Sequence, residues 1–553
     1  MKKIQIIDER DMIKRDISLS EIDKVSDLLS EEKFYLFKGA DILDFKNGIN
    51  WEYQHSHSTA TYQVYLHSLD MITYLCNQYK KTKETWLLEK SLKILKSWIE
   101  YDYSPKKKPP EKMWYDHPAS CRALTISFFY VLSKNILELD EDLVYDCLVK
   151  HAQFLHQDEN YVQSNHGIMM DRALILLSKL LAHHKDAQEW QDKALMRIRE
   201  AFNRDFSRMG THLENSPDYH QLIGNLFRTT EVFLNKNNLT LGEDINQRLK
   251  LARRYFQYLA KPDKTLPMLG DSSSISKIRD RKKFDNFIDI QAGIAILQQL
   301  HQSNSRFSTW FTFVCGFGSR THKHHDDLSF NLFWKGKEIF IDSGKYNYDK
   351  KNKNRAYITS PLAHNTIAIE GMTYALGDPL KAIKNITITD FTSNPYYDLV
   401  KGINMNYKGK KVYRTIIFLK SNIFIIFDKI LSNTACKGLQ LFNLAPHIEI
   451  VDRTDKRILI KSEEESIEII PMLDVDDIKI YHGDRKTPRA VISQRFAELT
   501  DISQIEISKK GKDLEFLTLI KLGEKTPIPE IEHNQKVGQL LIRTNQQELN
   551  LVL

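Results

Sequence analysis

The sequence predicts a multidomain α + β protein, with an N-terminal αα toroid followed by a C-terminal antiparallel β-sandwich. The chain has 553 residues, which is too many for one hydrophobic core. Apolar residues recur at helical spacing from about residue 60 to 300, and beyond Arg306 they form short runs of strand type. We therefore expect a helical toroid domain at 1–305 and a β-sandwich domain at 306–553.

The helical half begins with two segments joined by a short polar connection. Apolar residues at helical spacing run from Tyr62 to Leu75 and again from Leu88 to Ile99, with Lys-Thr-Lys between the segments. This pattern predicts an αα-hairpin. Many helices with short loops and no fixed repeat length favour a closed toroid over an open solenoid. The further expected helices are 119–135, 142–156, 167–183, 187–203, 219–236, 242–260 and 284–301.

The second half has the pattern of an antiparallel sandwich. Its first run, 310–317, is aromatic and β-branched, and 328–334 alternates apolar with mostly polar residues. Lys335–Lys337 reads as a tight turn into a strand at 338–342. Similar runs separated by turn residues predict a sandwich of many strands. They lie at 365–369, 386–390, 412–419, 423–427, 448–451 and 458–461, and the remainder continues in this manner.

Composition narrows the classes of function. A net charge of +7 suits an anionic substrate, although it also occurs in proteins without an anionic partner. We find no nucleic-acid-binding module and no run of 18 apolar residues, so neither nucleic-acid binding nor membrane insertion is expected. The apolar run of a signal peptide is broken by Asp8, Glu9 and Arg10. The expected location is cytoplasmic, or periplasmic or secreted if the sequence is a mature form.

The cysteines indicate neither a disulfide framework nor a zinc finger. Their number is odd and no CxxC pair occurs, so we interpret them as buried small hydrophobic residues. They are Cys76, Cys121, Cys147, Cys315 and Cys436.

Two polar clusters interrupt the helical half. Asn165 and His166 stand at the expected start of a helix, where a helix N-cap alone would explain the asparagine. Tyr219 and His220 follow Pro217 at the start of another helix, and such a pair more often packs than reacts. Taken singly, neither cluster establishes a catalytic site.

The densest polar cluster lies between the first two strands of the β half. The run from Thr321 to Asp327 contains His322, His324, His325 and two aspartates. A solvated loop does not require so many imidazoles, so we interpret the run as functional. Metal ligation and acid–base chemistry are both open to it.

Two downstream residues could complete a metal site of the His₂Asp type with His324. Asp342 ends the second strand, and His364 precedes a later one. If the turn between the strands is tight, Asp342 faces about Leu332, which leaves a gap of about 25 Å to His324. The histidine loop must then fold back over the sheet for this site to exist.

Together these motifs resemble the heparinase II/III superfamily of polysaccharide lyases, in particular its heparinase III-like members, and they are similar to oligoalginate lyases. The likeness covers most of the chain, and its specificity comes from the order of the motifs. They are Asn165-His166, Ser216-Pro-Asp-Tyr219, His322-x-His324-x-Asp326-x-Leu-Ser-Phe330, Ile341-Asp-Ser-Gly344 and Ala363-His-Asn-Thr366. The resemblance implies an incomplete αα toroid joined to an antiparallel β-sandwich.

The resemblance also implies roles for catalytic residues. Asn165, with His166, would neutralise the carboxylate of a uronic acid. Tyr219 would be the catalytic tyrosine and His322 the second acid–base residue, while Tyr346 matches a further active-site tyrosine more loosely.

A metal site is implied as well. His324, Asp342 and His364 would bind one divalent metal, commonly zinc and structural, and no organic cofactor is needed. The chain departs from the family pattern at Lys323 and His325, where small residues are usual, so His324 and His325 compete as the ligand.

The implied reaction is β-elimination of a uronic-acid-containing polysaccharide, such as heparan sulfate or another glycosaminoglycan, to give 4,5-unsaturated uronate ends. A tyrosine that acts as base must lose a proton, and cationic neighbours could lower its pKa from about 10. A histidine base needs less tuning. We assign Arg122, Arg172 and Lys323 as substrate contacts on charge alone.

Two other classes of function remain open. A glycoside hydrolase would need two opposed carboxylates, for which Glu214 and Asp218 are candidates. A non-catalytic binding protein of a capsule or exopolysaccharide system would not need the Asn–Tyr–His set. The sequence does not indicate an oligomeric state.

Overall fold

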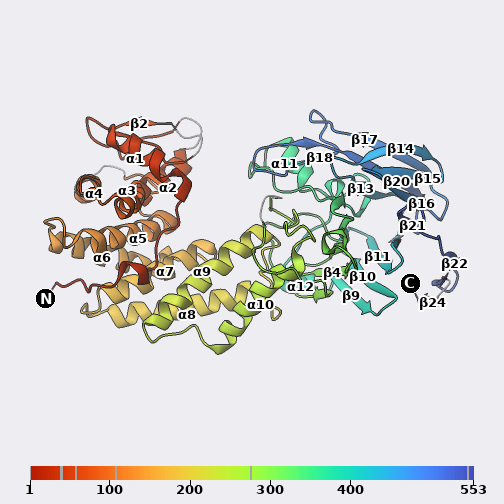
Figure 1. Cartoon of the computed structure of the whole chain (residues 1–553), viewed down its shortest axis with the longest axis horizontal. Helices are drawn as coiled ribbons and strands as arrows, with labels where there is room; N and C mark the ends of the chain where they lie inside the picture. The colour runs from red at the N-terminus through yellow and green to blue at the C-terminus, as the bar shows by residue number, and fades with distance from the viewer. Residues whose placement is uncertain are drawn as a thin grey trace. The chain divides into compact units, whose positions relative to one another are not determined.

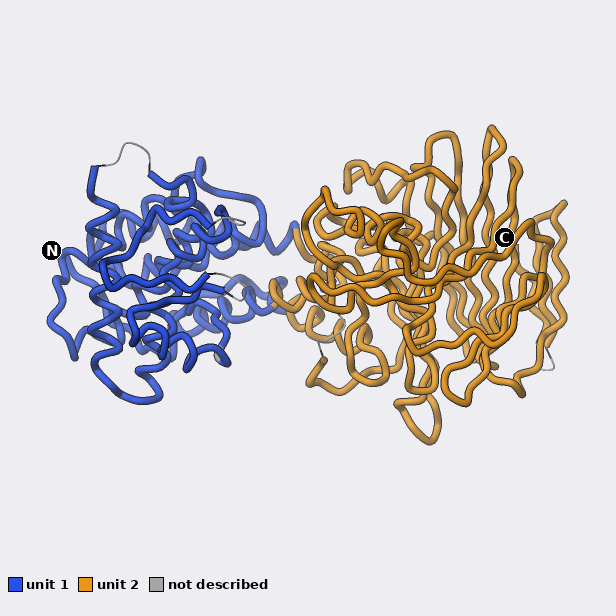
Figure 2. Tube along the Cα trace, turned by 90° about the horizontal axis from the view of Figure 1, so that it is seen from above, with its two compact units in different colours: residues 1–204, 225–247 blue, residues 205–224, 248–553 orange. Residues whose placement is uncertain are grey.

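The computed structural model describes residues 2–37, 41–55, 59–105, 109–273, 277–544 and 547–552. The chain divides into two compact units (Figure 2). Unit 1 contains residues 1–204 and 225–247, and unit 2 contains residues 205–224 and 248–553.

Unit 1 is built from antiparallel helical hairpins, which confirms the helical character expected of this half (Figure 1). Helix α5 is its centre, because it contacts α2, α3, α4, α6 and α7 and is buried along nearly all of its length. The predicted hairpin is present, but its first segment is broken at Leu69, which has a φ of +58°. The helices are α1 (Ile22–Ser30), α2 (Thr59–Ser68), α3 (Asp70–Thr82), α4 (Trp86–Tyr103), α5 (Asp116–Ser133), α6 (Glu141–His156), α7 (Asn165–Leu180), α8 (Ala187–Asp205) and α9 (Pro217–Lys236), of which α9 belongs to unit 2 as far as Gly224 and to unit 1 from Asn225.

The helix predicted at 284–301 is wrong. This segment forms the antiparallel strands β3 (Phe287–Asp289) and β4 (Ile294–Gln299). A short apolar run is compatible with either a helix or a strand, and here hydrogen bonding of β4 to β5 (Thr309–Val314) stabilises the strand. Strands therefore start before residue 306, and the domain boundary at 305 stays a prediction.

A five-stranded antiparallel sheet supports the residues of interest in unit 2. Its order is β3-β4-β5-β6-β7, with β6 at Ser329–Trp334 and β7 at Lys337–Phe340. One face packs against α10 (Glu243–Leu259), where Tyr255 and Leu259 meet Trp310 and Phe333. The other face enters the sandwich core, so β6 is buried on both sides.

The sandwich itself confirms the antiparallel β architecture. An eight-stranded sheet has the order β14-β15-β16-β21-β12-β11-β10-β9, and a four-stranded sheet has the order β17-β20-β13-β8. Their shared core contains Phe330, Phe424, Phe442 and Ile507. The strands are β8 (Ile367–Ile369), β9 (Ile386–Ser393), β10 (Tyr397–Asn404), β11 (Lys410–Leu419), β12 (Ile423–Ser432), β13 (Cys436–Asn443), β14 (Glu449–Thr454), β15 (Arg457–Ser462), β16 (Glu465–Pro471), β17 (Asp477–His482), β20 (Ser503–Gly511) and β21 (Leu514–Leu522).

Smaller elements complete the two units. Leu540 and Ile542, from the last three-stranded sheet, cover the outer face of the eight-stranded sheet. These elements are β1 (Lys33–Phe34), β2 (Leu43–Asp44), β18 (Val491–Ile492), β19 (Thr500–Asp501), β22 (Glu530–Asn534), β23 (Gln539–Arg543), β24 (Glu548–Val552), α11 (Lys353–Ile358) and α12 (Pro379–Ala382).

The predicted pairing of Asp342 with Leu332 is wrong by two residues. Leu332 pairs with Phe340, and the register shifts between Leu332 and Phe333. An extra residue in β7 causes this shift, as in a β-bulge.

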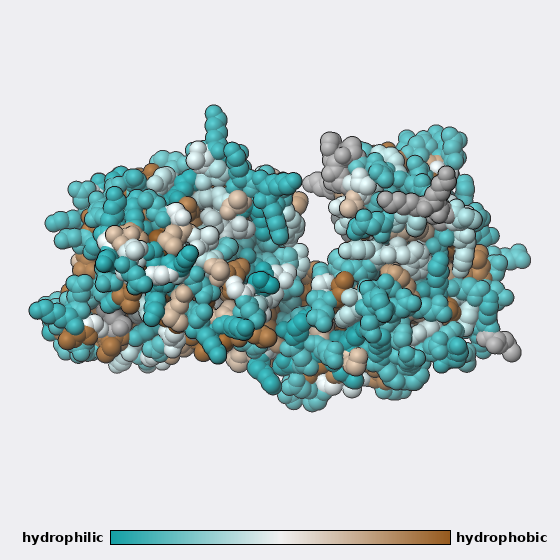
Figure 3. All heavy atoms as spheres, turned by 180° about the vertical axis from the view of Figure 1, so that it is seen from behind, coloured by the Kyte–Doolittle hydropathy of each residue, from teal (hydrophilic) through white to brown (hydrophobic). Residues whose placement is uncertain are grey.

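The surface and the cysteines agree with the composition. The face seen in Figure 3 is mostly hydrophilic, with apolar residues in small scattered groups. Among the described residues, no helix is long and apolar enough to cross a membrane. The five cysteines are free thiols, of which Cys436 is half-buried and the others are buried.

Candidate active site

The histidine-rich loop between β5 and β6 is held from inside by Lys323. Its ammonium group is fully buried and forms ion pairs with Asp326 and, at 3.0 Å, with Asp327. Asp327 also accepts hydrogen bonds from the Gly316 N–H and from the Tyr374 hydroxyl. This burial contradicts the predicted contact between Lys323 and substrate, because the charge is already used within the loop.

The same loop folds back over the sheet. The His325 N–H donates to the Thr359 carbonyl at 3.0 Å, and the Thr366 hydroxyl donates to the Asp327 carbonyl at 2.7 Å. Leu328, with a φ of +66°, turns the chain from the loop into β6. These contacts bring the loop to the segment that carries His364.

The candidate metal ligands His324, Asp342 and His364 come together. All three are buried, and one possible ligand atom from each lies within 4.8 Å of the other two. Three buried atoms in this group have no hydrogen-bond partner: His324 Nδ1, Asp342 Oδ2 and His364 Nε2. Buried polar atoms are rarely left unpaired, and two imidazoles with a carboxylate are a donor set that zinc accepts. The residues therefore fit a metal ion.

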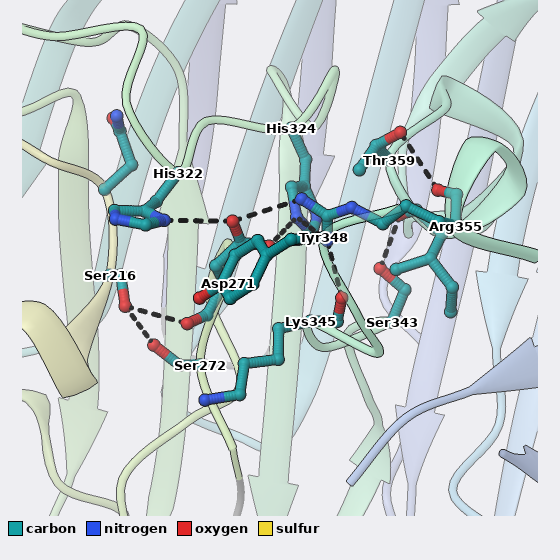
Figure 4. A network of polar contacts seen from close by, with 12 residues as sticks. Ser216, Asp271, Ser272, His322, His324, Ser343, Lys345, Tyr348, Arg355 and Thr359 are labelled. Atoms are coloured by element: carbon teal, nitrogen blue, oxygen red, sulfur yellow. Dashed lines mark hydrogen bonds and ion pairs between the residues drawn. The ribbon is translucent and has the colours of Figure 1, made fainter. Parts of the chain in front are cut away.

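His322 lies beside this cluster and is oriented by Asp271 (Figure 4). Its Nδ1 is 3.0 Å from Asp271 Oδ2, and its ring stacks on that of Tyr219 with centroids 3.6 Å apart. The second nitrogen, Nε2, lies 3.8 Å from Glu214. The structure thus brings together two of the predicted catalytic residues, His322 and Tyr219.

The Tyr219 hydroxyl lies 3.2 Å from that of Tyr348. Burial raises the pKa of Tyr219, the hydrogen bond with Tyr348 opposes this, and the charges of Asp271 and Glu214 add to the rise. The lowered pKa that cationic neighbours would give is therefore not found. Tyr219 is protonated at neutral pH and suited to donate a proton.

Asp271 is a site residue that the sequence analysis missed. It is 2% exposed and accepts hydrogen bonds from His322, His324 and Arg355, the last through both of its oxygens. Burial alone would raise the pKa of Asp271, but these three donors hold it far below its ordinary value. The Gly-Asp-Ser-Ser run that contains it was the available sequence signal.

Tyr348, two residues after the predicted Tyr346, contacts the pair of Tyr219 and His322. The Tyr346 side chain packs in an apolar cluster with Tyr357 and Val491, whereas Tyr348 reaches Tyr219 and His322. Tyr346 lies at a turn with a φ of +57°, and its predicted substrate-binding role stays a prediction.

Asn165 and His166 belong to unit 1, where they stand at the start of α7. Ser164 is the N-cap and accepts from the His166 N–H, so Asn165 is free of the capping role considered for it. Within the described residues, the half-buried Asn165 carboxamide has no hydrogen-bond partner and remains available to a ligand. His166 Nδ1 lies 3.2 Å from Asp116, and its side chain is 38% exposed.

The two arginines assigned as substrate contacts are internal. Arg122 has no exposed surface and donates to the His67 and Met113 carbonyls, and Arg172 donates to the Leu226 carbonyl. Their burial contradicts the predicted contacts, because each guanidinium is already bound to backbone oxygens inside unit 1.

Asp218 and Glu214, the carboxylates considered for a hydrolase, contact other side chains and do not form an opposed catalytic pair. Asp218 accepts hydrogen bonds from both the N–H and the hydroxyl of Ser273 at 3.0 Å. Glu214 lies beside His322. The geometry does not favour hydrolysis.

Comparison with known proteins gives matches along most of the chain. The family description "Heparinase II/III N-terminus" matches residues 2–293, and "Heparinase II/III-like, C-terminal" matches residues 291–529. A heparin-sulfate lyase of Bacteroides thetaiotaomicron is 22% identical over 469 residues, which cover 74% of this chain and 65% of that protein. A heparin-sulfate lyase of Bacteroides stercoris is 20% identical over 55% of this chain and 49% of its own length. The chain therefore spans less than two thirds of these curated relatives.

Solved structures share the fold over nearly the whole chain. The crystal structure of heparinase III has a TM-score of 0.77 at 19% identity, covering 97% of this chain and 91% of its own. Heparan sulfate lyase HepC from Pedobacter heparinus has a TM-score of 0.75 at 16% identity, covering 99% and 90%. These likenesses confirm the predicted toroid and sandwich as the fold class. Since the N-terminal family description alone matches more than half of the residues, the chain belongs to the heparinase II/III family.

Proposed function

We propose that the protein is a polysaccharide lyase that cleaves an acidic, uronic-acid-containing polysaccharide by β-elimination. The main structural support is the arrangement of His322, which is held by the buried carboxylate of Asp271 and stacked on Tyr219. Membership of the heparinase II/III family and the names of the curated relatives support a glycosaminoglycan such as heparan sulfate as substrate. The net charge of +7 is compatible with this.

The difficult step is removal of the proton from C5 of the uronic acid. The adjacent carboxylate is already negative, and proton loss places further charge on it. The free carboxamide of Asn165, with His166, can donate hydrogen bonds to that group, which stabilises the transition state more than the ground state.

His322 is the proposed base and Tyr219 the proposed acid. When Nδ1–H of His322 donates to Asp271, Nε2 carries a lone pair that can take the C5 proton. The electron pair of the C5–H bond forms the C4–C5 double bond as the bond from C4 to O4 breaks. Tyr219, whose raised pKa keeps it protonated, gives its proton to O4.

The metal proposal rests on the three unpaired atoms of His324, Asp342 and His364. A divalent ion bound there, zinc by its donor set, would supply positive charge that holds the three side chains together. Its role is structural, since His324 also binds Asp271 and so fixes the loop that carries His322. No organic cofactor is required.

A tyrosine substitution tests the proposed chemistry. Tyr219→Phe keeps the ring that stacks on His322 but removes the proton donor, so we expect a loss of about a hundredfold or more in kcat. The measurement is the ultraviolet absorbance of the unsaturated uronate formed from heparan sulfate. Tyr396→Phe, at a site 52% exposed, is the control and should retain activity. Full product formation by Tyr219→Phe would rule out this assignment.

A further inference from the structure

We propose that Tyr348, Phe496 and Lys345 form a subsite that binds one anionic pyranose ring of the substrate next to the bond that is cleaved. The identity of the polymer rests on the proposed lyase function. The subsite itself is inferred from exposure, backbone geometry and charge within unit 2.

The first observation is a pair of exposed aromatic rings. Tyr348 is 48% exposed and Phe496 is 55% exposed, and their centroids lie 6.1 Å apart. An aromatic ring is costly to leave in water, and one that has a second exposed ring beside it indicates a binding surface. The apolar C–H face of a pyranose is a suitable partner for such rings.

The second observation is the position of this pair. The Tyr348 hydroxyl is 3.2 Å from that of Tyr219, and the Tyr348 ring centroid is 6.2 Å from that of His322. A sugar on these rings would therefore adjoin the proposed acid and base. The ring contacts run from His322 to Tyr348 and from Tyr348 to Phe496, so Phe496 continues the aromatic surface.

The third observation is that two distant segments are tied together to present the rings. Gly344 pairs with Ser493, and a Cβ on Gly344 would come within 2.1 Å of the Ser493 carbonyl oxygen, so only glycine fits. The Ala497 N–H donates to the Tyr346 carbonyl at 2.8 Å. Tyr346 and Ala497 both have positive φ, at +57° and +62°. Strained turns of this kind gather at binding sites.

The fourth observation is the charge beside the rings. Lys345 Nζ lies 6.0 Å from the centroid of Phe496 and 3.7 Å from a carboxylate oxygen of Asp218. Lys345 and Tyr348 belong to the same turn beside the Asp271 network (Figure 4). A cation at the edge of an aromatic surface is suited to the carboxylate or sulfate of a sugar whose face stacks on the rings. The class of ligand is thus a carboxylated or sulfated pyranose.

Direct binding tests this proposal in the full-length chain. A Tyr219→Phe background slows turnover by about a hundredfold or more, and a size-defined heparan sulfate octasaccharide is titrated by calorimetry. We expect Phe496→Ala to weaken Kd about fivefold to tenfold, because one face of the sugar loses its apolar partner. Phe496→Trp should retain affinity. Phe307→Ala removes a ring that is 41% exposed elsewhere in unit 2 and should change nothing.

The charge and the alternatives are tested in the same series. Lys345→Gln should weaken binding and reduce its dependence on salt. Unchanged affinity in Phe496→Ala would overturn the subsite. If that variant also changed its oligomeric state, the exposed ring would serve contact between copies of the chain and not sugar binding. A parent that binds no uronate saccharide would contradict the proposed function and the subsite together, whereas binding that ignores Phe496 would contradict the subsite alone.

Discussion

At the scale of single residues, Asp271 decides which nitrogen of His322 is available for chemistry. A carboxylate can only accept, so the proton of a neutral His322 lies on Nδ1 and the lone pair lies on Nε2. Arg355 binds both oxygens of Asp271 and prevents the carboxylate from turning away. Asp271 is therefore a positioning residue for the proposed base.

Replacement of Asp271 tests this role. In Asp271→Asn the amide can donate to Nδ1, which leaves the proton on Nε2, and we expect kcat to fall about a hundredfold or more with little change in KM. Asp271→Glu restores an acceptor and should recover part of kcat. Asp280→Asn, which removes an exposed partner of Arg253, is the control. Equal losses in the Asn and Glu variants would indicate a purely structural role.

The buried His220 is expected to make the stability of the folded protein depend on pH. It accepts from the His212 N–H through Nδ1 and donates to the Ala252 carbonyl through Nε2, and burial lowers its pKa to about 4. The pKa of His220 is lower in the folded state than in the unfolded state, so the unfolded state binds a proton first as the pH falls. The contribution of neutral His220 to folding stability is therefore complete above pH 6.5 and is lost as the pH falls toward 4. The loss is up to roughly 3 kcal/mol.

Urea unfolding at a series of pH values measures this effect. His220→Gln keeps a donor and an acceptor but does not titrate, so its stability should fall less between pH 6.5 and 4 than that of the parent. His183→Gln, at an exposed position, should follow the parent. Identical pH profiles for the parent and His220→Gln would contradict this interpretation.

Single residues also show where sequence reasoning stops. His322, Tyr219 and the metal candidates could be found because they stand in dense or ordered motifs. Lys323 could not be recognised as internal, because its role depends on a loop that buries its ammonium group. Tyr348 and Tyr346 are two residues apart, and a strained turn, invisible in the sequence, places Tyr348 beside Tyr219.

At the scale of elements, the first turn of α7 is fixed by Gly167. A Cβ at this position would lie 2.0 Å from the Val162 carbonyl oxygen and 3.0 Å from the Tyr161 ring. Gly167→Ala should lower stability by about 2 kcal/mol and displace Asn165 and His166, with loss of kcat.

A second glycine supplies the matched control. Gly224 lies within α9 with nothing within 4 Å of its Cβ position, so Gly224→Ala should stabilise by about 0.5–1 kcal/mol. Thermal unfolding and turnover of both variants make the comparison. If both substitutions changed the stability in the same direction, the close approach at Gly167 would be refuted.

The loop between β5 and β6 is the element that the metal would hold. We expect one equivalent of zinc by elemental analysis and a fall in Tm of about 5 °C or more on chelation, since the ion binds only the folded state. His364→Ala should contain no metal and show no response to the chelator. His482→Ala, on β17, should behave as the parent. A parent that contains no metal after purification in zinc would contradict the site.

Elements were predictable to different degrees. The long helices α4 to α10 were found from periodicity, although α5 and α7 are buried on most sides and not along one stripe alone. The segment 284–301 was misread because its apolar residues are buried on both faces by neighbours far along the chain. The register of β7 was misjudged because the connection is shorter than expected: Trp334 pairs with Lys337, which leaves only Lys335 and Gly336 in the turn.

At the scale of the whole molecule, the site depends on contacts between residues that are distant in sequence. Asp271 meets His322 across 51 positions and Arg355 across 84 positions. Spacing alone does not predict such contacts, whereas the order of the motifs along the chain was sufficient to indicate the family. The matches to both heparinase II/III descriptions bear out that indication.

The most direct test of the lyase proposal measures two products in one reaction. The full-length protein is incubated with a panel of uronate polysaccharides, and new reducing ends and the ultraviolet absorbance of unsaturated uronate are followed together. Elimination predicts one unsaturated uronate for each new reducing end, with both signals lost in Tyr219→Phe. New reducing ends without that absorbance would indicate hydrolysis and contradict the proposed function.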